Sequence, residues 1–209
     1  MKGRVQVYTG DGKGKTTASL GLALRAIGQG FKVIMIQFMK GGAYTGEYIA
    51  AKNYLPNFEI YQYGRGCIKQ QKQLKMKGFY NLPDHEKKHK FFDYVREDIE
   101  CGPCRYCFLN DSIQGQYVQD AFTKTKDVIL NSEHNVIILD EINVAMQLGY
   151  LDPKNVIEIL EQKPEHKEII LTGRGAPEEL KKCADLVTEM TLKKHYFDDG
   201  QMARRGIEY

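Results

Sequence analysis

The feature that most constrains this chain is a glycine-rich segment, TGDGKGKT at residues 9–16, between a short apolar run and a helix-forming stretch. The apolar run at residues 5–8 predicts a strand, and the following stretch predicts a helix that ends near Ile27. Strand, glycine-rich turn, Lys-Thr and helix in this order are typical of a P-loop. The segment therefore predicts a nucleotide-binding site.

The roles of the loop residues follow from phosphate chemistry. Glycines let several backbone N–H groups point at one anion, and the helix N-terminus adds its positive end. Lys15 supplies a full charge, and Thr16 is placed to bind a Mg²⁺ ion held by the same phosphates. The pattern G-x-x-x-x-G-K-[ST] would begin with glycine, but here that position is Thr9. A glycine-rich turn without a ligand is the alternative. The residues predicted to bind nucleotide are Thr9, Gly10, Asp11, Gly12, Lys13, Gly14, Lys15, Thr16 and Thr17.

Length and composition favour a single cytoplasmic domain. The 209 residues suffice for one sizeable core, and 42% hydrophobic with 27% charged residues is ordinary for a globular protein. A net charge of +3 is too small to indicate binding to nucleic acid or a membrane. Because the sequence has no long apolar run and no signal-peptide pattern, we expect a cytoplasmic protein.

Strands alternate with helices along most of the chain. This alternation predicts an α/β fold of the P-loop NTPase type, a mostly parallel sheet of about six strands with helices on both faces. Further strands are expected at 32–38, 58–63, 135–141, 168–172 and about 186–192. Further helices are expected at 46–54, 112–130, from 151 onward with Asp152 as cap, and at 177–184.

The alternation breaks between about residues 64 and 115, where the chain is lysine-rich and aromatic. We interpret this stretch as an insertion on a single domain that spans residues 1–209. A helix is expected within it at residues 83–100, because Phe91, Phe92, Val95 and Ile99 are spaced for one helical face.

Two polar segments follow buried strands and complete the predicted nucleotide site. Asp140 and Glu141 end an apolar run, where a carboxylate can hold Mg²⁺ beside a phosphate loop. A solvated helix start is the alternative for this pair. Arg174 lies past another strand end on the same edge of the sheet and can neutralise a polyphosphate or grip a substrate. A solvated arginine in a helix-entry loop is its alternative.

The chain resembles the ATP:corrinoid adenosyltransferases of cobalamin synthesis and salvage. The resemblance covers most of the chain outside the insertion, and the Thr-Gly-Arg segment and the tail make it specific. The matching segments are residues 9–18 (TGDGKGKTTA), 37–41 (QFMKG), 139–143 (LDEIN), 172–177 (TGRGAP), 184–190 (ADLVTEM), 194–200 (KHYFDDG) and 206–209 (GIEY).

The resemblance implies that the Co(I) of a reduced corrinoid attacks the 5′ carbon of ATP and expels triphosphate. Such a reaction requires that the negative charge of the leaving triphosphate be neutralised. The groups that could do so are the loop amides, Lys13, Lys15, Arg174 and Mg²⁺. The reaction needs no base to activate a water molecule. Lys15, Thr16, Glu141 and Arg174 are the expected catalytic residues. The resemblance also implies a homodimer that receives its electron from a reductase or flavoprotein, and an ATP that lies reversed in the loop.

In this family, aromatic side chains after the third strand, including a tryptophan, displace the lower axial ligand of cobalt. The present sequence departs from the family at this position. The corresponding turn here is GRGCIK at residues 64–69, and the chain has no tryptophan. Aromatic residues that could replace the missing ones are Phe79, Tyr80, Phe91, Phe92, Tyr106 and Phe108.

The insertion also carries a cysteine motif. Its three cysteines, with Cys67 as a fourth thiolate, could bind zinc or an iron–sulfur cluster; they are Cys101, Cys104 and Cys107. The alternatives are unligated thiols or a mobile loop on the corrinoid side. The stretch from His85 to His89 matches the zinc-protease pattern H-E-x-x-H, but its lysine-rich context argues against a protease, and either histidine could instead be a fourth ligand. The fifth cysteine, Cys183, is expected to be buried in the core.

Two other functions remain open at this point. A nucleoside kinase of the thymidine-kinase type combines a P-loop, an Asp-Glu strand and a cysteine-bearing loop, but needs a carboxylate base. A non-catalytic, ATP-binding regulatory module would share the same nucleotide site.

Overall fold

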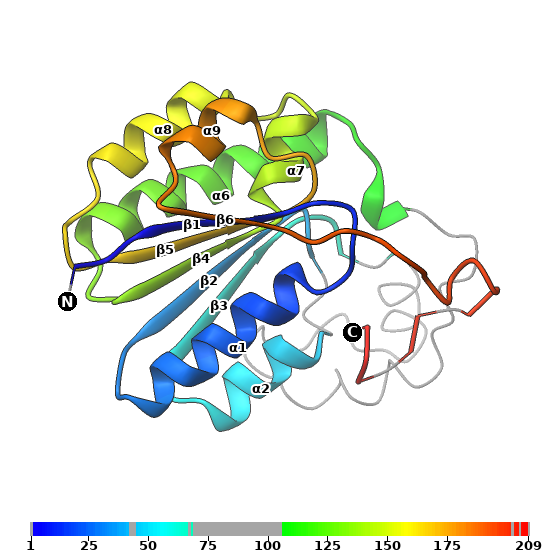
Figure 1. Ribbon diagram of the computed structural model, residues 1–209, viewed down its shortest axis with the longest axis horizontal. Helices are drawn as coiled ribbons and strands as arrows, with labels where there is room; N and C mark the ends of the chain where they lie inside the picture. The colour runs from blue at the N-terminus through cyan, green and yellow to red at the C-terminus, as the bar shows by residue number, and fades with distance from the viewer. Residues whose placement is uncertain are drawn as a thin grey trace, which may run out of the picture.

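The computed structural model describes residues 2–41, 45–66, 68, 106–201, 203–204 and 206–208. Six strands form one sheet, and every neighbouring pair runs parallel (Figure 1). This arrangement confirms the predicted α/β fold of the P-loop type. In sheet order the strands are β3 (Phe58–Tyr63), β2 (Val33–Phe38), β4 (Val136–Asp140), β5 (Glu168–Thr172), β1 (Val5–Thr9) and β6 (Leu186–Glu189).

Helices cover both faces of the sheet (Figure 1). One face carries α1 (Lys15–Gly28) and α2 (Gly46–Tyr54). The other face carries α6 (Ser112–Asn131), α7 (Ile142–Gln147), α8 (Pro153–Glu161) and α9 (Glu178–Cys183). A short 3₁₀ turn, η2 (Tyr106–Phe108), precedes α6.

Local sequence signals explain several of these boundaries. Asp152 caps α8 as predicted, because its carboxylate accepts a hydrogen bond of 2.9 Å from the backbone N–H of Lys154, and Pro153 occupies the first turn. Asp111 caps α6 in the same way through Gln114. The helix α7 was not predicted, because its six residues are too few to show a helical period. The last strand ends at Glu189 instead of near residue 192.

The central strands are buried on both faces. All residues of β2 and β4 are buried. Ile34 and Ile36 belong to the core beneath α6 and α8, whereas Val33 and Met35 belong to the core beneath α1. A run of consecutive apolar residues, rather than an alternating pattern, is what two covered faces require.

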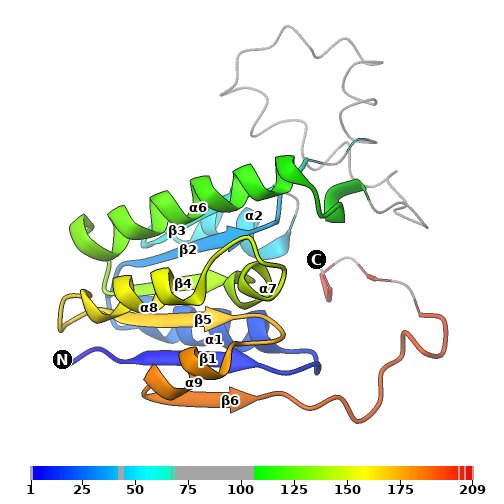
Figure 2. The same cartoon turned by 90° about the horizontal axis from the view of Figure 1, so that it is seen from above.

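Because all strands are parallel, their carboxyl ends meet at one edge of the sheet. The strand β6 lies at the border of the sheet with all four residues exposed, and the chain after it runs past that edge (Figure 2). Within the described ranges, none of the helices combines the length and the apolar character of a membrane span. The predicted insertion and its helix at 83–100 lie largely outside the described residues.

Candidate nucleotide site

The phosphate loop between β1 and α1 lies against the chain that follows β6. The backbone N–H of Met190 donates to the carbonyl of Thr9 at 2.9 Å, and the N–H of Gly12 donates to the carbonyl of Met190 at 2.7 Å. A Cβ atom on Gly10 would lie 2.5 Å from the Met190 oxygen, and one on Gly12 would lie 2.7 Å from it. The glycines at these two positions are therefore required by the close approach of Met190.

The side-chain contacts of Thr9 explain why the motif begins with threonine and not with its usual glycine. Its side chain is 3% exposed, and its hydroxyl oxygen accepts a hydrogen bond of 3.1 Å from the backbone N–H of Ala176. Ala176 is in the loop after β5 that also carries Arg174. A threonine at this position thus links the phosphate loop to the Thr-Gly-Arg loop.

Lys15 begins α1 and turns back over the phosphate loop. Its ammonium donates to the carbonyl oxygens of Gly10 at 2.7 Å and of Gly12 at 2.6 Å. Its pKa is lowered, because burial disfavours the charged form and Arg174 adds like-charge repulsion, while the negative charge of Glu141 acts in the opposite direction. The charges of Arg174 and Glu141 therefore both affect the protonation of Lys15.

Asp140 is the centre of the polar network at the carboxyl ends of the strands. It is fully buried, and its Oδ1 accepts hydrogen bonds from the hydroxyls of Thr16 at 2.8 Å and Thr172 at 2.7 Å. Its Oδ2 accepts from Gln37 at 3.1 Å and from the ammonium of Lys40 at 2.7 Å. Burial acts to raise the pKa of Asp140, but Lys40 and these hydrogen bonds outweigh it, so the pKa is lowered and the carboxylate stays ionised.

Gln37 and Lys40 are network residues to which sequence reasoning assigned no role. Gln37 is fully buried at the end of an apolar strand, and it also contacts Glu47 of α2 at 3.0 Å. Lys40 follows the same strand. A polar residue inside a buried strand was the available signal, because such a group needs hydrogen-bonding partners.

Glu141 occupies a left-handed backbone conformation, with φ of 64°, at the start of α7. Its N–H donates to the Thr172 hydroxyl at 3.2 Å. Its pKa is raised, because burial and the charge of Asp140 disfavour a second carboxylate. Left-handed backbone on a residue other than glycine costs energy and is found preferentially at functional sites.

Asn143 fixes the Thr-Gly-Arg loop beside α7. Its side-chain N–H groups donate to the carbonyl oxygen of Gly173 at 3.2 Å and to that of Tyr8 at 3.4 Å. Gly173 has a φ of 128°, and a Cβ there would lie 3.0 Å from the Cβ of Asn143, so glycine is required. The side chain of Arg174, next in the chain, is exposed at this edge.

The residues around Asp140 fit a Mg²⁺ ion. Thr16, Asp140 and Glu141 offer oxygen donors of the kind that this hard cation prefers, and Thr16 and Asp140 are already in contact. The described residues contain no group of three or more histidine, cysteine or acidic side chains that could hold a metal. The fit therefore rests on a hydroxyl and two carboxylates.

The structure tests only part of the predicted cysteine site. Cys67, Cys101 and Cys104 lie outside the described residues, as do His85 and His89. Cys107 is partly buried in η2. The prediction that Cys183 is buried was wrong: its side chain is exposed, because it is the last residue of α9 and the buried position of that helix is Leu180.

An ion pair joins the two ends of the predicted insertion. The side chain of Arg65, which follows β3, is 7% exposed and is paired with Asp111, the cap of α6. The guanidinium also lies over the ring of Tyr106, 5.1 Å from its centroid. Both ends of the insertion therefore start from the carboxyl edge of the sheet.

Comparison with known proteins identifies relatives along the whole chain. The family model described as ATP:corrinoid adenosyltransferase BtuR/CobO/CobP matches residues 1–113 and 76–209. A corrinoid adenosyltransferase of Sinorhizobium sp is 32% identical over 210 residues, covering 100% of this chain and 81% of that protein. Proteins of the same name are 27% identical in Pseudomonas aeruginosa and 29% identical in Escherichia coli K12. Each aligns over 208 residues and 100% of this chain, covering 84% and 86% of the respective relative.

Proposed function

The chain belongs to the family of ATP:corrinoid adenosyltransferases, and on that premise we propose that the network around Asp140 is its ATP site. The observation that carries this proposal is the hydrogen bond of 2.8 Å between Thr16 and Asp140. It joins the phosphate loop to a carboxylate 124 residues later in the chain. A phosphate loop with a buried carboxylate beside its threonine is the arrangement that Mg²⁺–nucleotide sites use.

The reaction is an alkyl transfer. The Co(I) of a reduced corrinoid attacks the 5′ carbon of ATP, a cobalt–carbon bond forms, and the bond between that carbon and the triphosphate oxygen breaks. The electron pair of the broken bond leaves with the triphosphate. Because the nucleophile carries no proton, the protein needs no general base, and we assign none.

In this proposal the protein binds the triphosphate and stabilises the charge that develops on it. The loop amides of residues 10–14, the ammonium of Lys15 and the guanidinium of Arg174 would supply the positive charge. The ammonium of Lys15 donates to two loop carbonyls at 2.6 and 2.7 Å, so it lies within the loop that would bind the phosphates. Thr17, next to Thr16 at the start of α1, would contribute its N–H at the helix end.

We propose that Thr16, Asp140 and Glu141 would hold Mg²⁺. When bound, the ion would supply positive charge that stabilises the departing triphosphate. Lys40 pairs with Oδ2 of Asp140, and Oδ1 faces Thr16. Lys40 thus keeps Asp140 ionised and, with Gln37, fixes the orientation of its carboxylate.

The corrinoid side of the site is proposed to include the insertion. Since Arg65 and Asp111 hold both of its ends at the carboxyl edge of the sheet, the insertion starts from the same edge that carries the nucleotide site. The zinc or iron–sulfur centre at Cys67, Cys101, Cys104 and Cys107 stays a prediction, which metal analysis and a visible-absorption spectrum of anaerobically purified protein would test. A colourless protein without stoichiometric metal would contradict it.

Family membership also supports three further proposals, on the oligomeric state, the location and the electron donor. We propose a homodimer, a cytoplasmic location and a reductase or flavoprotein that supplies the electron. Sedimentation of the purified protein would measure the first, and reduction of bound corrinoid by candidate flavoproteins would test the third.

Product identity distinguishes the proposed function from its alternatives. The protein is incubated with ATP, Mg²⁺ and chemically reduced corrinoid, and the products are separated. Free triphosphate and a light-sensitive cobalt–carbon bond are expected. ADP with a phosphorylated nucleoside would support a kinase instead, and nucleotide binding without either product would support a regulatory module.

Two loop variants test the assigned site. Lys15→Ala and Thr16→Ala should each lose at least about 100-fold in ATP-dependent turnover, because removal of one donor to developing charge costs about that much. Circular dichroism should show the folded domain in both. Unchanged turnover in both variants would remove the phosphate loop from the mechanism.

A further inference from the structure

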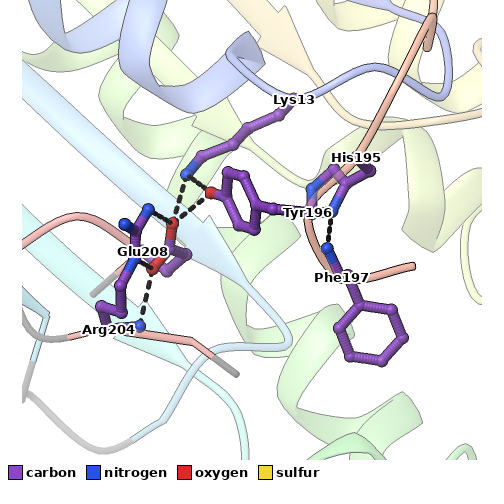
Figure 3. Close-up of polar contacts among 6 residues, drawn as sticks. All are labelled: Lys13, His195, Tyr196, Phe197, Arg204 and Glu208. Atoms are coloured by element: carbon purple, nitrogen blue, oxygen red, sulfur yellow. Dashed lines mark hydrogen bonds and ion pairs between the residues drawn. The ribbon is translucent and has the colours of Figure 1, made fainter. Parts of the chain in front are cut away.

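The C-terminal tail returns to the phosphate loop and forms a cluster with it (Figure 3). We call this cluster the tail latch; its members are Lys13, Tyr196, Arg204 and Glu208. The ammonium of Lys13 donates to the hydroxyl of Tyr196 at 2.6 Å and to Oε1 of Glu208 at 2.7 Å. Lys13 is thus bound by residues that follow it by more than 180 positions.

Glu208 is the centre of the latch. Besides Lys13, its carboxylate accepts hydrogen bonds from the Tyr196 hydroxyl, from the Arg204 backbone N–H at 2.6 Å and from the Arg204 guanidinium at 3.2 Å. The ring of Tyr196 contacts both cations, with its centroid 5.3 Å from the ammonium of Lys13 and 4.9 Å from the guanidinium carbon of Arg204. The side chain of Glu208 is only 16% exposed, because its hydrogen-bonding partners shield the carboxylate from solvent on most sides.

The latch is the second contact between the tail and the phosphate loop. The first is the backbone pairing of Met190, which binds the N–H of Gly12 at 2.7 Å. Lys13 is the next residue, and Gly14 after it has a φ of 118°. The tail therefore holds two consecutive residues of the segment whose glycines would otherwise leave it with the most conformational freedom.

We propose that the tail latch preorganises the phosphate loop for ATP. Tyr196, Arg204 and Glu208 act as positioning residues, which through Lys13 hold the loop amides in the arrangement that receives the triphosphate. This inference rests on the proposed use of the loop for ATP. The physical reason is entropic: a loop fixed before binding does not have to be ordered by the ligand, so less of the binding free energy is lost.

The first test is the affinity of the full-length protein for ATP with Mg²⁺, measured by isothermal titration calorimetry. Glu208→Gln keeps the shape of the side chain but removes the charge that binds both cations. It should raise the Kd for ATP by about tenfold, since charge-assisted hydrogen bonds contribute more than neutral ones. Asp199→Asn is the matched control, because it makes the same charge change in the same tail at a side chain outside the latch, and its Kd should equal that of the wild type.

A double-mutant cycle tests whether the effect passes through Lys13. In a Lys13→Met background, Glu208→Gln should have little further effect on the Kd, whereas independent contributions would add. Tyr196→Phe, which removes one hydroxyl and keeps the ring, should raise the Kd by a smaller factor. Steady-state assays should show a raised KM for ATP with kcat and the KM for corrinoid unchanged, which general loss of structure would not produce.

Three results would overturn the proposal. If the Kd of Glu208→Gln for ATP equals that of the wild type, the carboxylate does not preorganise the phosphate loop. If the Kd is lower, the carboxylate competes with the triphosphate for the loop. An equal loss with and without Lys13 would show that Glu208 does not act through it. If thermal unfolding shows that Glu208→Gln does not fold, Tyr196→Phe takes its place, measured alone and in the Lys13→Met background. ATP binding is measured without corrinoid, so the latch is tested even if adenosyl transfer is not observed.

Discussion

Thr9→Val is the substitution that best isolates one contact of the nucleotide site. Valine has the same branched shape and suits a strand, so the change removes a hydroxyl and little else. That hydroxyl is the acceptor for the backbone N–H of Ala176 at 3.1 Å, and Ala176 is 6% exposed. The variant therefore leaves a buried N–H without its partner, while the bond from Met190 to the Thr9 backbone remains.

The expected cost follows from that orphaned donor. A buried polar group left unsatisfied costs about 1–3 kcal/mol, so we expect a loss of about 2 kcal/mol in the free energy of unfolding. For a chain of this size, such a loss lowers Tm by about 4–8 °C. The loop that carries Arg174 would also lose its anchor to the phosphate loop, so the Kd for ATP should rise.

Thr125→Val is the matched control, measured by thermal and urea unfolding beside Thr9→Val. Thr125 is also fully buried, but its hydroxyl donates to the carbonyl of Ala121 at 2.9 Å, one turn earlier in α6. That carbonyl keeps its helical hydrogen bond in the variant, so the cost should stay below about 1 kcal/mol. Equal stability of Thr9→Val and the wild type, or equal costs for the two variants, would refute the assigned role of Thr9.

Further variants address the sheet edge and the pH dependence of folding. Gly41→Ala should strongly reduce folded yield and Tm, because its Cβ would lie 1.9 Å from the carbonyl oxygen of Gly64, whereas Gly21→Ala in α1 meets nothing within 4 Å and should stabilise by about 0.5–1 kcal/mol. The pKa of His134 is lowered, chiefly because burial disfavours the charged ring, so the folded state binds its proton more weakly than the unfolded state. The contribution of neutral His134 to the free energy of unfolding is therefore fully present above about pH 6.5, the pKa of histidine in the unfolded chain. It is lost as the pH falls from there toward the lower pKa of His134 in the folded state. The substitution His134→Gln should therefore flatten this part of the Tm–pH curve. A Tm–pH curve that His134→Gln leaves unchanged would contradict this assignment.

The local patterns of the sequence were sufficient for most of the fold. The bounds of α2, β3 and β5 agree with the predicted ranges. The strand β3 alternates between buried and exposed residues, and β5 is a short, almost continuously buried run. The meeting of Thr16 and Asp140 was also predictable, since parallel strands bring their carboxyl ends to one edge. The helix α7 and the exposed position of Cys183 were not predictable, because short helices depend on what they pack against.

Patterns in the amino-acid sequence were enough to predict the phosphate loop, the parallel sheet and the family to which the chain belongs. The folded structure was needed to explain why position 9 is a threonine, which side chains bind Asp140 and where the tail lies. The hydroxyl of Thr9 meets Ala176, 167 residues later, and Lys13 meets Glu208, 195 residues later. Contacts at such separations leave no local period in the sequence, because they depend on how the strands and the tail come together in space.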